Sequence, residues 1–258
     1  MNTSSVTDFP AISLQEMEGI KLMNRVDTKF LIRADSLPDI LERCRENYLV
    51  QDMQGVRVAR YHTMYYDTPA HDYYLMHLHG KATRQKIRVR TYMDSDNLTF
   101  LEIKNKTSKG RTKKKRREVP ADCLEHFQDS PSEVMDFFRE RSMFPPESLS
   151  PSLDIRFDRI TLVNRARTER LTIDTGLSFL NPRTDRCSTL SDVVVVELKR
   201  DGLTPSAMKD ILLDMRVFPA KFSKYCTGVM LTDDSLPRGR FKPRLVKLSK
   251  TRNKNTAI

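Results

Sequence analysis

The sequence predicts an α+β fold in which eight antiparallel strands close into a barrel with a charged interior, flanked by helices. Several segments alternate charged and apolar residues with a period of two, which places the charges on one face of each strand. The connections between these segments are short enough for antiparallel pairing. The charged faces carry mostly positive charge, and like charges opposite one another destabilise a sheet. A closed interior that holds a polyanion would relieve this repulsion.

Extended alternation and turn signals define the order of the predicted elements. The eight strands lie over residues 25–32, 56–67, 83–93, 98–107, 111–119, 153–164, 170–179 and 193–200. Helices are predicted over residues 12–23, 36–46, 70–77, 121–127, 131–141, 205–215 and 223–231. If these helices cover the apolar faces, the charged faces line the inside of the closed sheet.

The N-terminal elements have recognisable boundaries. Arg25, Asp27 and Lys29 share one face of the first strand. Ser36 is a favourable N-cap for the helix that follows it. The second strand ends at the sequence Asp-Thr-Pro over 67–69, which is a turn signal.

Three consecutive basic strands form the centre of the prediction. One face of the first carries Arg84, Lys86, Arg88 and Arg90. One face of the second carries Glu102, Lys104 and Lys106, and the third contains five consecutive cations over 113–117. Polar turns over 94–97 and 108–110 join the three strands into hairpins.

The last three strands continue the alternation. Their charged faces carry Asp154, Arg156 and Asp158, then Arg170 and Asp174, and finally Glu197 and Lys199. Four consecutive valines over 193–196 begin the last strand, which indicates a buried position. Helices over 205–215 and 223–231 complete the fold.

Composition points to an acidic partner. Among 258 residues, 45 are Lys or Arg and 34 are Asp or Glu, which gives a net charge of +11. No segment approaches the roughly 18 apolar residues of a membrane span. The first twenty residues lack the basic and apolar regions of a secretory signal, and the four cysteines form no CxxC pair, so a cytoplasmic protein with reduced thiols is expected.

Three regions are predicted along the chain. Residues 1–23 form an N-terminal arm with a short helix, and residues 24–235 form the barrel domain. Residues 236–258 contain eight cations and no acid, a composition that predicts a disordered tail.

Six short motifs occur in an order that resembles one known family. They are Arg25-Val26-Asp27-Thr28-Lys29-Phe30, Tyr65-Tyr66-Asp67-Thr68, Lys86-Ile87-Arg88-Val89-Arg90, Leu101-Glu102-Ile103-Lys104, Val196-Glu197-Leu198-Lys199 and Ser223-Lys224-Tyr225. Together they resemble the VTC (vacuolar transporter chaperone) domain, the polyphosphate polymerase branch of the triphosphate tunnel metalloenzymes, also called CYTH-like proteins. The resemblance spans residues 24–231.

The resemblance implies an eight-stranded tunnel in which the γ-phosphate of ATP is transferred to inorganic polyphosphate. It implies catalytic roles for Lys29, Arg88, Arg90, Lys199 and Lys224. It implies phosphate binding by Lys86, Lys104, Lys106, Arg156, Arg170 and Ser223, and binding of Mn²⁺ or Mg²⁺ by Glu197 with help from Glu102. Glu102 is equally well explained as the salt-bridge partner of Arg88 or Lys104. Expected partners are ATP, polyphosphate or pyrophosphate, and a membrane protein that would place the chain at the inner face of a membrane.

One departure from the superfamily pattern separates the alternatives. Hydrolytic members begin with E-x-E-x-K, whereas this chain has Arg25 and Asp27 at the two acidic positions. This difference favours the polymerase over a triphosphate or tripolyphosphate hydrolase. A non-catalytic module that binds polyphosphate or nucleotides is a third reading. Specific nucleic-acid binding is disfavoured, because Tyr92 and Phe100 are the only aromatic residues near the basic strands that could stack on bases.

Overall fold

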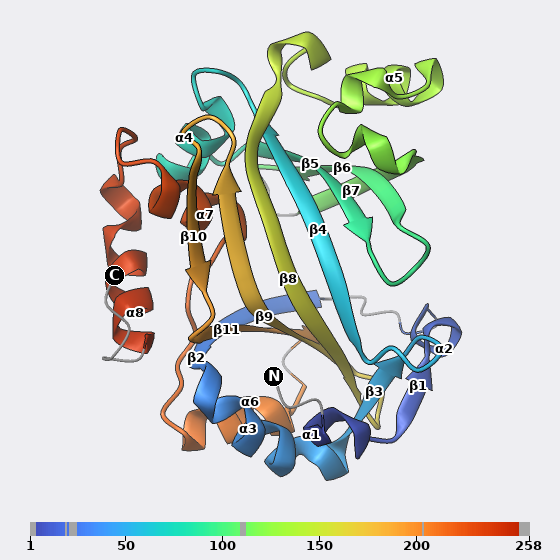
Figure 1. Cartoon of the computed structure of the whole chain (residues 1–258). Helices are drawn as coiled ribbons and strands as arrows, with labels where there is room; N and C mark the ends of the chain where they lie inside the picture. The colour runs from blue at the N-terminus through green and yellow to red at the C-terminus, as the bar shows by residue number, and fades with distance from the viewer. Residues whose placement is uncertain (1–3, 19, 21–24, 109–111, 203, 253–258) are drawn as a thin grey trace.

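The computed structural model describes residues 4–18, 20, 25–108, 112–202 and 204–252, and its centre is a strongly curved sheet (Figure 1). The main path of this sheet contains eight strands, and all its neighbouring pairs are antiparallel. In spatial order they are β2 (Arg25–Arg33), β11 (Val193–Asp201), β9 (Glu169–Asn181), β8 (Ser150–Asn164), β4 (Val58–Asp67), β5 (Arg84–Tyr92), β6 (Leu98–Lys106) and β7 (Thr112–Val119). These are the eight strands that the alternation predicts.

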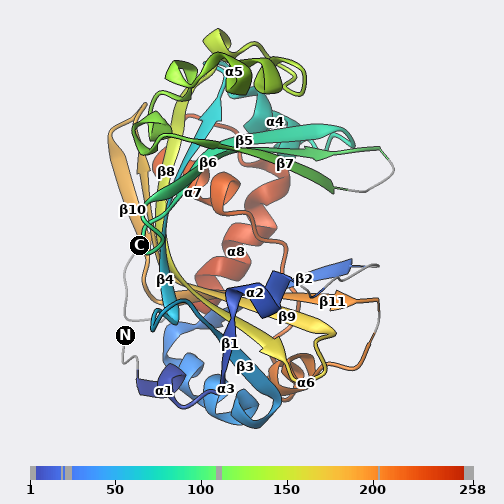
Figure 2. The same cartoon turned by 90° about the vertical axis from the view of Figure 1, so that its right-hand side faces the viewer.

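The prediction of a closed barrel is not met. Among the described residues, β2 and β7 lie at the two ends of the path and are not paired with each other. Figure 2 shows β5, β6 and β7 on one side of the concave face and β2, β11 and β9 on the other. Burial, and then the charges of Lys86 and of Lys29 on β2, lower the pKa of Lys104 on β6 to about 8, so cations from the two sides of the concave face repel one another.

Three further strands extend the sheet to eleven strands, and the sequence did not reveal them. β3 (Tyr48–Asp52) pairs antiparallel with β8 and parallel with β1 (Ala11–Ser13), while β10 (Arg186–Leu190) pairs with β9. All three are short, and β10 is largely exposed. Short strands of this kind give too few alternating positions to be recognised by period.

Helices cover both faces of the sheet. α3 (Leu37–Cys44) and α6 (Ala207–Asp214) pack on the outer face of β2, β9 and β11, burying Ile40, Leu41, Met208 and Leu212. α4 (Asp72–Leu78), α5 (Ser132–Arg139) and the short 3-10 helices at Ala121–Leu124 and Phe127–Asp129 cover the outer side of β4 to β7. The remaining short helices are α1 (Ser4–Thr7) and α2 (Leu14–Glu18), with 3-10 turns at Ala34–Ser36, Arg45–Asn47, Pro146–Ser148 and Gly239–Phe241.

α7 (Lys224–Thr232) is packed directly on the concave face of β8 and β9. The packing is tight at Gly228, where an added Cβ would lie 2.4 Å from Leu153 and 2.5 Å from Phe179. Only glycine allows this approach, which fixes the position of the N-terminus of α7 beside the charged part of the concave face.

The basic C-terminal segment is ordered over the described residues, contrary to the prediction from its composition. Lys242–Thr251 forms helix α8, which contacts β2 and lies near α7 (Figure 2). Leu248 is buried, and Phe241 is buried with its ring 5.8 Å from that of Tyr74 on α4. The two apolar anchors are joined by polar contacts: Arg252 pairs with Asp192 at 2.9 Å, and Lys247 donates hydrogen bonds to the carbonyl oxygens of Phe218 and Pro219. No helix in the described part of the chain is long and apolar enough to cross a membrane.

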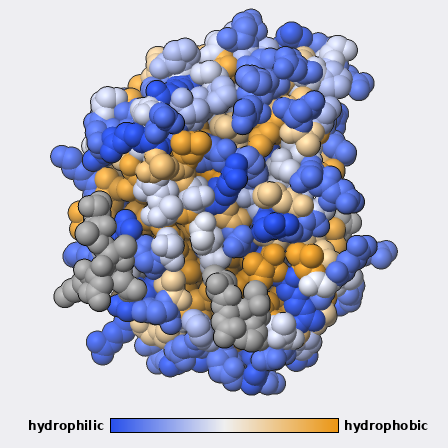
Figure 3. Space-filling model, viewed as in Figure 1, coloured by the Kyte–Doolittle hydropathy of each residue, from blue (hydrophilic) through white to orange (hydrophobic). Residues whose placement is uncertain are grey.

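Over the long strands the surface mixes hydrophobic, intermediate and hydrophilic residues, and hydrophilic residues predominate around the rim of this view (Figure 3). The cysteines agree with the prediction of reduced thiols: Cys44, Cys123 and Cys226 are buried and free, and Cys187 is exposed and free.

Candidate active site

Charged side chains from seven strands and from the start of α7 gather on the concave face. Residues that are directly opposite in an antiparallel sheet share a face, so the register identifies the members. The cations of this concave cluster include Lys29, Arg84, Lys86, Arg88, Arg90, Lys104, Lys106, Lys114, Arg116, Arg159, Arg170, Lys199 and Lys224, and its carboxylates include Asp27, Glu102, Asp174 and Glu197.

Glu102 joins two neighbouring strands to its own. It is 1% exposed, and its two carboxylate oxygens accept hydrogen bonds from Arg88 (2.5 Å) and Lys114 (2.8 Å). Burial opposes ionisation of Glu102, but these cations together with Arg90 hold its pKa well below the usual range. Glu102 is therefore a salt-bridge partner, and at 1% exposure it is less accessible to a metal ion than Glu197, which is 19% exposed. The sequence suggested a salt bridge from Glu102 to Arg88 or Lys104. The structure shows the salt bridge to Arg88, and the second partner is Lys114 rather than Lys104.

The hydroxyl of Tyr65 belongs to the same group. It accepts a hydrogen bond from Arg88 (3.1 Å), and its ring stacks on Tyr225 at 5.1 Å. Burial raises the pKa of Tyr65, yet the charges of Arg88, Lys86 and Arg90 outweigh it and lower the pKa to about 7. The positive potential at this point is strong enough to favour an anion.

Asp174 positions two further cations. Its carboxylate accepts two hydrogen bonds from Arg159, at 2.5 and 2.8 Å, and one from Lys224 at the start of α7. Phe157 lies beside both, with its ring 5.3 Å from the guanidinium of Arg159 and 4.3 Å from the ammonium of Lys224. Burial lowers the pKa of Lys224 to about 8, with Asp174 acting against this and Arg159 adding to it.

Glu197 is more accessible than Glu102 and Asp174. Its side chain is 19% exposed, 3.2 Å from Lys199 and 4.0 Å from Lys29. Burial raises its pKa, but Lys29 and Lys199 lower it well below the usual range, so Glu197 is ionised. The neighbouring Thr172 lies directly opposite Glu197 on β9, and its buried hydroxyl has no hydrogen-bond partner among the described residues.

Positive charge exceeds negative charge on this face. Glu102, Asp174 and Glu197 each already pair with two cations. Within the described ranges, Lys86, Arg90 and Lys104 form no ion pair with a carboxylate. Lys86 donates a hydrogen bond to the hydroxyl of Ser223 (2.9 Å), and Arg90 donates one to Thr63 (3.0 Å). The unbalanced charge indicates a polyanionic ligand.

The structure brings most of the residues proposed from sequence together. Lys106 lies opposite Arg84 at the far end of β6, and Arg170 lies opposite Lys199 in the sheet. Ser223 caps α7 by accepting a hydrogen bond from the backbone N–H of Cys226. The side chain of Arg25, on which the departure from the hydrolase pattern partly rests, lies outside the described residues.

Arg156 is on the wrong face. It lies opposite His62 in the sheet, on the outer side, is 64% exposed and is 3.9 Å from Asp154. The prediction assumed that the more charged set of β8 faces inward, but the inward set is Ile155, Phe157 and Arg159. Arg156 is a solvated surface residue, and Arg159 supplies the cation from this strand.

Sequence reasoning missed several members of the site. Arg159 and Lys114 are cations whose strands carry charge on both faces, so period alone does not place them. Asp174 was recognised as part of an alternating face but was given no role. Thr172 alternates in sequence with Arg170 and Asp174 and therefore lies on the same face of β9. This spacing could have identified it as a member of the site.

The residues present fit a divalent ion only in part. The described residues contain no group of three or more His, Cys, Asp or Glu side chains that could hold a metal ion. Glu197 offers one accessible carboxylate, and the unpartnered hydroxyl of Thr172 lies next to it. A hard cation prefers six or more oxygen ligands, so most of them must come from phosphate and water.

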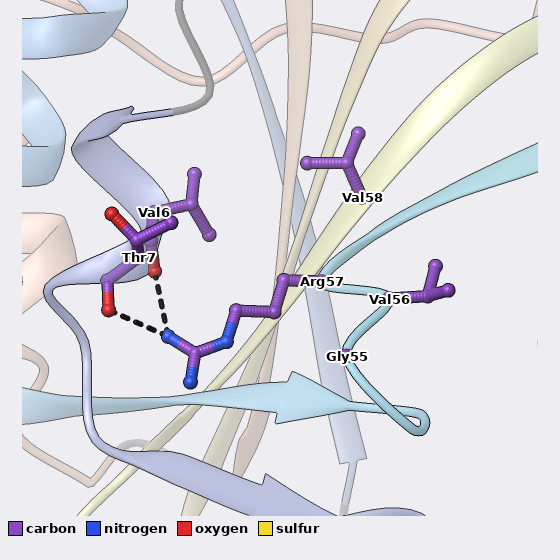
Figure 4. Close-up of a pocket in the computed structure, with 6 residues that line it drawn as sticks. All are labelled: Val6, Thr7, Gly55, Val56, Arg57 and Val58. Atoms are coloured by element: carbon purple, nitrogen blue, oxygen red, sulfur yellow. Dashed lines mark hydrogen bonds between the residues drawn. The ribbon is translucent and has the colours of Figure 1, made fainter.

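A second hollow lies away from the concave face, between the N-terminal segment and the β3–β4 turn (Figure 4). Its one charged side chain, Arg57, donates hydrogen bonds to the carbonyl oxygens of Val6 (3.3 Å) and Thr7 (2.7 Å). Arg57 also pairs with Asp52 at 2.8 Å. Arg57 thus joins the N-terminal segment to Asp52, which is a structural role for the one charged side chain of this hollow.

The curved sheet and its cationic concave face are features that suit a polyanionic ligand. The chain belongs to the VTC domain family, whose model matches residues 24–232. No curated protein sequence matches the chain significantly.

Two solved structures share the fold at low sequence identity. One is a candidate adenylate cyclase from Bacillus halodurans, with 14% identity, a TM-score of 0.52, and coverage of 78% of this chain and 96% of that one. The other is a candidate adenylyl cyclase from Hippeastrum with a dominant triphosphatase activity; it has 14% identity and a TM-score of 0.50, and covers 81% of this chain and 96% of that one.

Proposed function

We propose that this chain is a metal-dependent phosphotransferase that transfers the γ-phosphoryl group of ATP to a growing chain of inorganic polyphosphate. One observation carries the proposal: Lys86, Arg90 and Lys104, cations without a carboxylate partner, lie on the same face as Glu197. Membership of the VTC domain family supports it. We assign the activity to residues 24–235.

The N-terminus of α7 favours an anion in the same place. Ser223 and Lys224 begin the helix, and its first turn contains no acidic residue. Helix N-termini attract negative charge, and acidic side chains usually supply it. Here Lys86 and Lys224 surround the N-terminus, so the negative charge is left for a phosphate group to provide.

The reaction needs alignment and charge neutralisation more than covalent help from the protein. A terminal oxygen of the acceptor chain forms a new bond to the γ-phosphorus, the bond from that phosphorus to the β–γ bridging oxygen breaks, and ADP leaves. Arg88, Arg90 and Arg159 have planar guanidinium groups suited to two phosphate oxygens at once. Lys29, Lys199 and Lys224 supply point charges, and Asp174 and Glu102 hold their partners in position.

Glu197 and Thr172 would hold Mn²⁺ or Mg²⁺ together with phosphate oxygens. Such an ion, when bound, neutralises charge that develops on the transferring group. We propose no metal role for Glu102, because it is 1% exposed and pairs with Arg88 and Lys114.

Hydrolysis of a triphosphate is the second candidate function. The shared fold of the Hippeastrum protein, which has triphosphatase activity, raises it. Asp27 also supports hydrolysis as a candidate function, because it lies opposite Lys199 and provides another carboxylate near Glu197. The two reactions differ only in whether phosphate or water accepts the phosphoryl group. A membrane-protein partner that receives the product remains part of the proposal from family membership.

Incubation of the purified chain with γ-labelled ATP and Mn²⁺ separates these functions. We expect a ladder of labelled polymer that disappears in Lys29→Ala and Glu197→Gln. Labelled free phosphate alone would identify a hydrolase. Polymer synthesis by both variants at the wild-type rate would refute the proposed site, and binding without turnover would identify a non-catalytic module.

A further inference from the structure

The two most exposed large hydrophobic side chains in the described part of the chain lie on two segments that touch. Phe218 is 59% exposed in the connection between α6 and α7, and Val246 is 53% exposed on α8. Lys247, the residue after Val246, donates hydrogen bonds to the carbonyl oxygens of Phe218 (2.9 Å) and Pro219 (2.8 Å). These bonds hold the connection against α8 at the outer edge of the molecule (Figure 1). Both apolar side chains therefore belong to one surface.

Lysines flank the exposed valine on α8. Residues four apart lie on the same face of a helix. Lys242, Val246 and Lys250 have this spacing, and all three are exposed. Leu248, on another face of the helix, is buried. The outward stripe of α8 thus places one apolar side chain between two cations.

The connection between α6 and α7 repeats this arrangement. Its cations Arg216 and Lys221 are exposed and stand on either side of Phe218 in the sequence. Neither the connection nor α8 contains an acidic residue. We call the surface formed by Arg216, Phe218, Lys221, Lys242, Val246 and Lys250 the outer basic face.

Two acidic residues at the margins of these segments are already paired. Asp192 forms an ion pair with Arg252 at 2.9 Å and is 7% exposed. Asp214, at the end of α6, forms an ion pair with Arg43 at 2.7 Å. These pairs leave the positive charge of the outer basic face without a described acidic partner of its own.

This combination suits the surface of an anionic lipid bilayer. Apolar side chains can enter the boundary between headgroups and acyl chains, while the surrounding cations meet the headgroups. Lysine carries a point charge on a flexible stem, so it needs no fixed geometry in its partner. Phe218 and Val246 supply the apolar part, and the lysines around them supply the charge.

Other occupants fit this surface less well. A second copy of the chain would bring the same cations and would be repelled. A stable protein interface buries about 800 Å² on each partner, and two separate apolar side chains supply little of the core that such an interface needs. Single-stranded nucleic acid stacks its bases on aromatic rings, and Val246 offers none.

We propose that the outer basic face docks this chain on a membrane surface that contains anionic lipid, with Phe218 and Val246 entering between the headgroups. The inference goes beyond the proposed function and does not depend on it, because no residue of the outer basic face belongs to the concave cluster.

Sedimentation of the full chain with phospholipid vesicles tests the proposal. We expect binding to vesicles of phosphatidylcholine that contain phosphatidylserine, and far weaker binding to phosphatidylcholine alone. Each lysine near an anionic surface contributes about fivefold to affinity, so the double variant Lys242→Gln, Lys250→Gln should bind about 25-fold more weakly. Both side chains are exposed, so the fold should be retained.

Two controls remove cations elsewhere. Lys113→Gln with Lys115→Gln takes the same charge from exposed positions on β7. Salt at about 0.15 M screens exposed charges beyond about 8 Å, so this double variant should bind vesicles as the wild type does. Lys104→Gln removes an exposed cation of the concave cluster and should also leave vesicle binding unchanged.

A fluorescence measurement locates the contact. The chain has no tryptophan, so Phe218→Trp introduces a single reporter at an exposed position. On binding to vesicles its emission should shift to shorter wavelength and be quenched by lipids brominated on their acyl chains. Leu180→Trp, at a position on β9 that is 42% exposed, is the control and should show neither change.

Each contrary result overturns the proposal. Equal binding by the wild type and the Lys242, Lys250 double variant would do so, as would unchanged emission of Phe218→Trp on bound vesicles. A loss of binding in Lys104→Gln would place the lipid headgroups on the concave cluster instead. If the wild type binds no vesicles but forms a dimer that Phe218→Asp dissociates, the occupant is a second copy. None of these results bears on polymer synthesis, which is measured separately.

Discussion

The ammonium group of Lys86 on β5 donates a 2.9 Å hydrogen bond to the hydroxyl of Ser223, although 137 residues separate the two in sequence. The same oxygen accepts the backbone N–H of Cys226 and so caps α7. One side chain therefore ties the position of a basic strand to the N-terminus of a helix. The contact sets where a phosphate can meet both.

Replacing Ser223 by alanine should affect both stability and ligand binding. Loss of the cap should lower the free energy of unfolding by about 1 kcal/mol, measured by urea denaturation. It should also weaken polyphosphate binding, because Lys86 and the first turn of α7 lose their common partner. Ser206 is the matched control, since it caps α6 through the N–H of Lys209 at 3.1 Å. Ser206→Ala should cost similar stability and leave polyphosphate affinity unchanged; equal binding by both variants would contradict the role of Ser223.

Asp174→Asn should destabilise the fold because it leaves Arg159 and Lys224 buried without a carboxylate. Breaking a buried ion pair typically costs about 3 kcal/mol or more. Burial raises the pKa of Asp174, but its two cations outweigh this and lower it. A carboxylate with a lowered pKa adds stability above its unfolded pKa of about 4, and this contribution is lost as pH falls through the folded value.

Urea denaturation from pH 7 down to pH 2 measures the effect. The wild-type chain should lose more stability than Asp174→Asn over this range. Asp234 gives the control, because it also pairs with two cations, Arg186 and Arg238, but is 63% exposed. Asp234→Asn should change stability far less. Equal changes in the two variants would show that burial of the Asp174 pairs is not what matters.

The affinity for polyphosphate should fall as pH rises above about 8. The pKa of Lys224 is lowered to about 8, first by burial and then by Arg159, with Asp174 acting in the opposite direction. Above that pH the group loses its charge in the free protein, and a bound phosphate must be accompanied by proton uptake. Lys224→Arg should show a flatter pH dependence, since arginine stays protonated throughout. Calorimetric titrations from pH 7 to pH 9.5 measure this, and identical profiles would remove Lys224 from the phosphate site.

Residue alternation predicted the strands of the main path because a period of two is a local signal. Whether β2 pairs with β7 depends on side chains that meet only after folding, and the sequence offers no local sign of it. The same limit explains why Arg156 was predicted on the wrong face of the sheet. Alternation separates Arg156 from Arg159 but does not tell which face of β8 turns inward. The prediction of a disordered C-terminal segment was wrong for another reason. Its composition is typical of disorder, but two of its residues, Phe241 and Leu248, are buried in the core.

Metal binding should require phosphate, because the protein supplies few ligands of its own. Glu197 provides one accessible carboxylate, and Thr172 a buried hydroxyl that has no hydrogen-bond partner among the described residues. Titration of Mn²⁺ followed by electron paramagnetic resonance should therefore show weak binding to the free protein and tighter binding when tripolyphosphate is present. Thr172→Val keeps the shape of the side chain and removes the oxygen, so it should weaken Mn²⁺ binding in the presence of tripolyphosphate several-fold without changing tripolyphosphate affinity in EDTA. Thr63→Val is the matched control, because Thr63 faces the same side but is engaged by Arg90. Tight Mn²⁺ binding without phosphate, or equal effects of the two valine variants, would show that Glu197 and Thr172 are not the metal-binding pair.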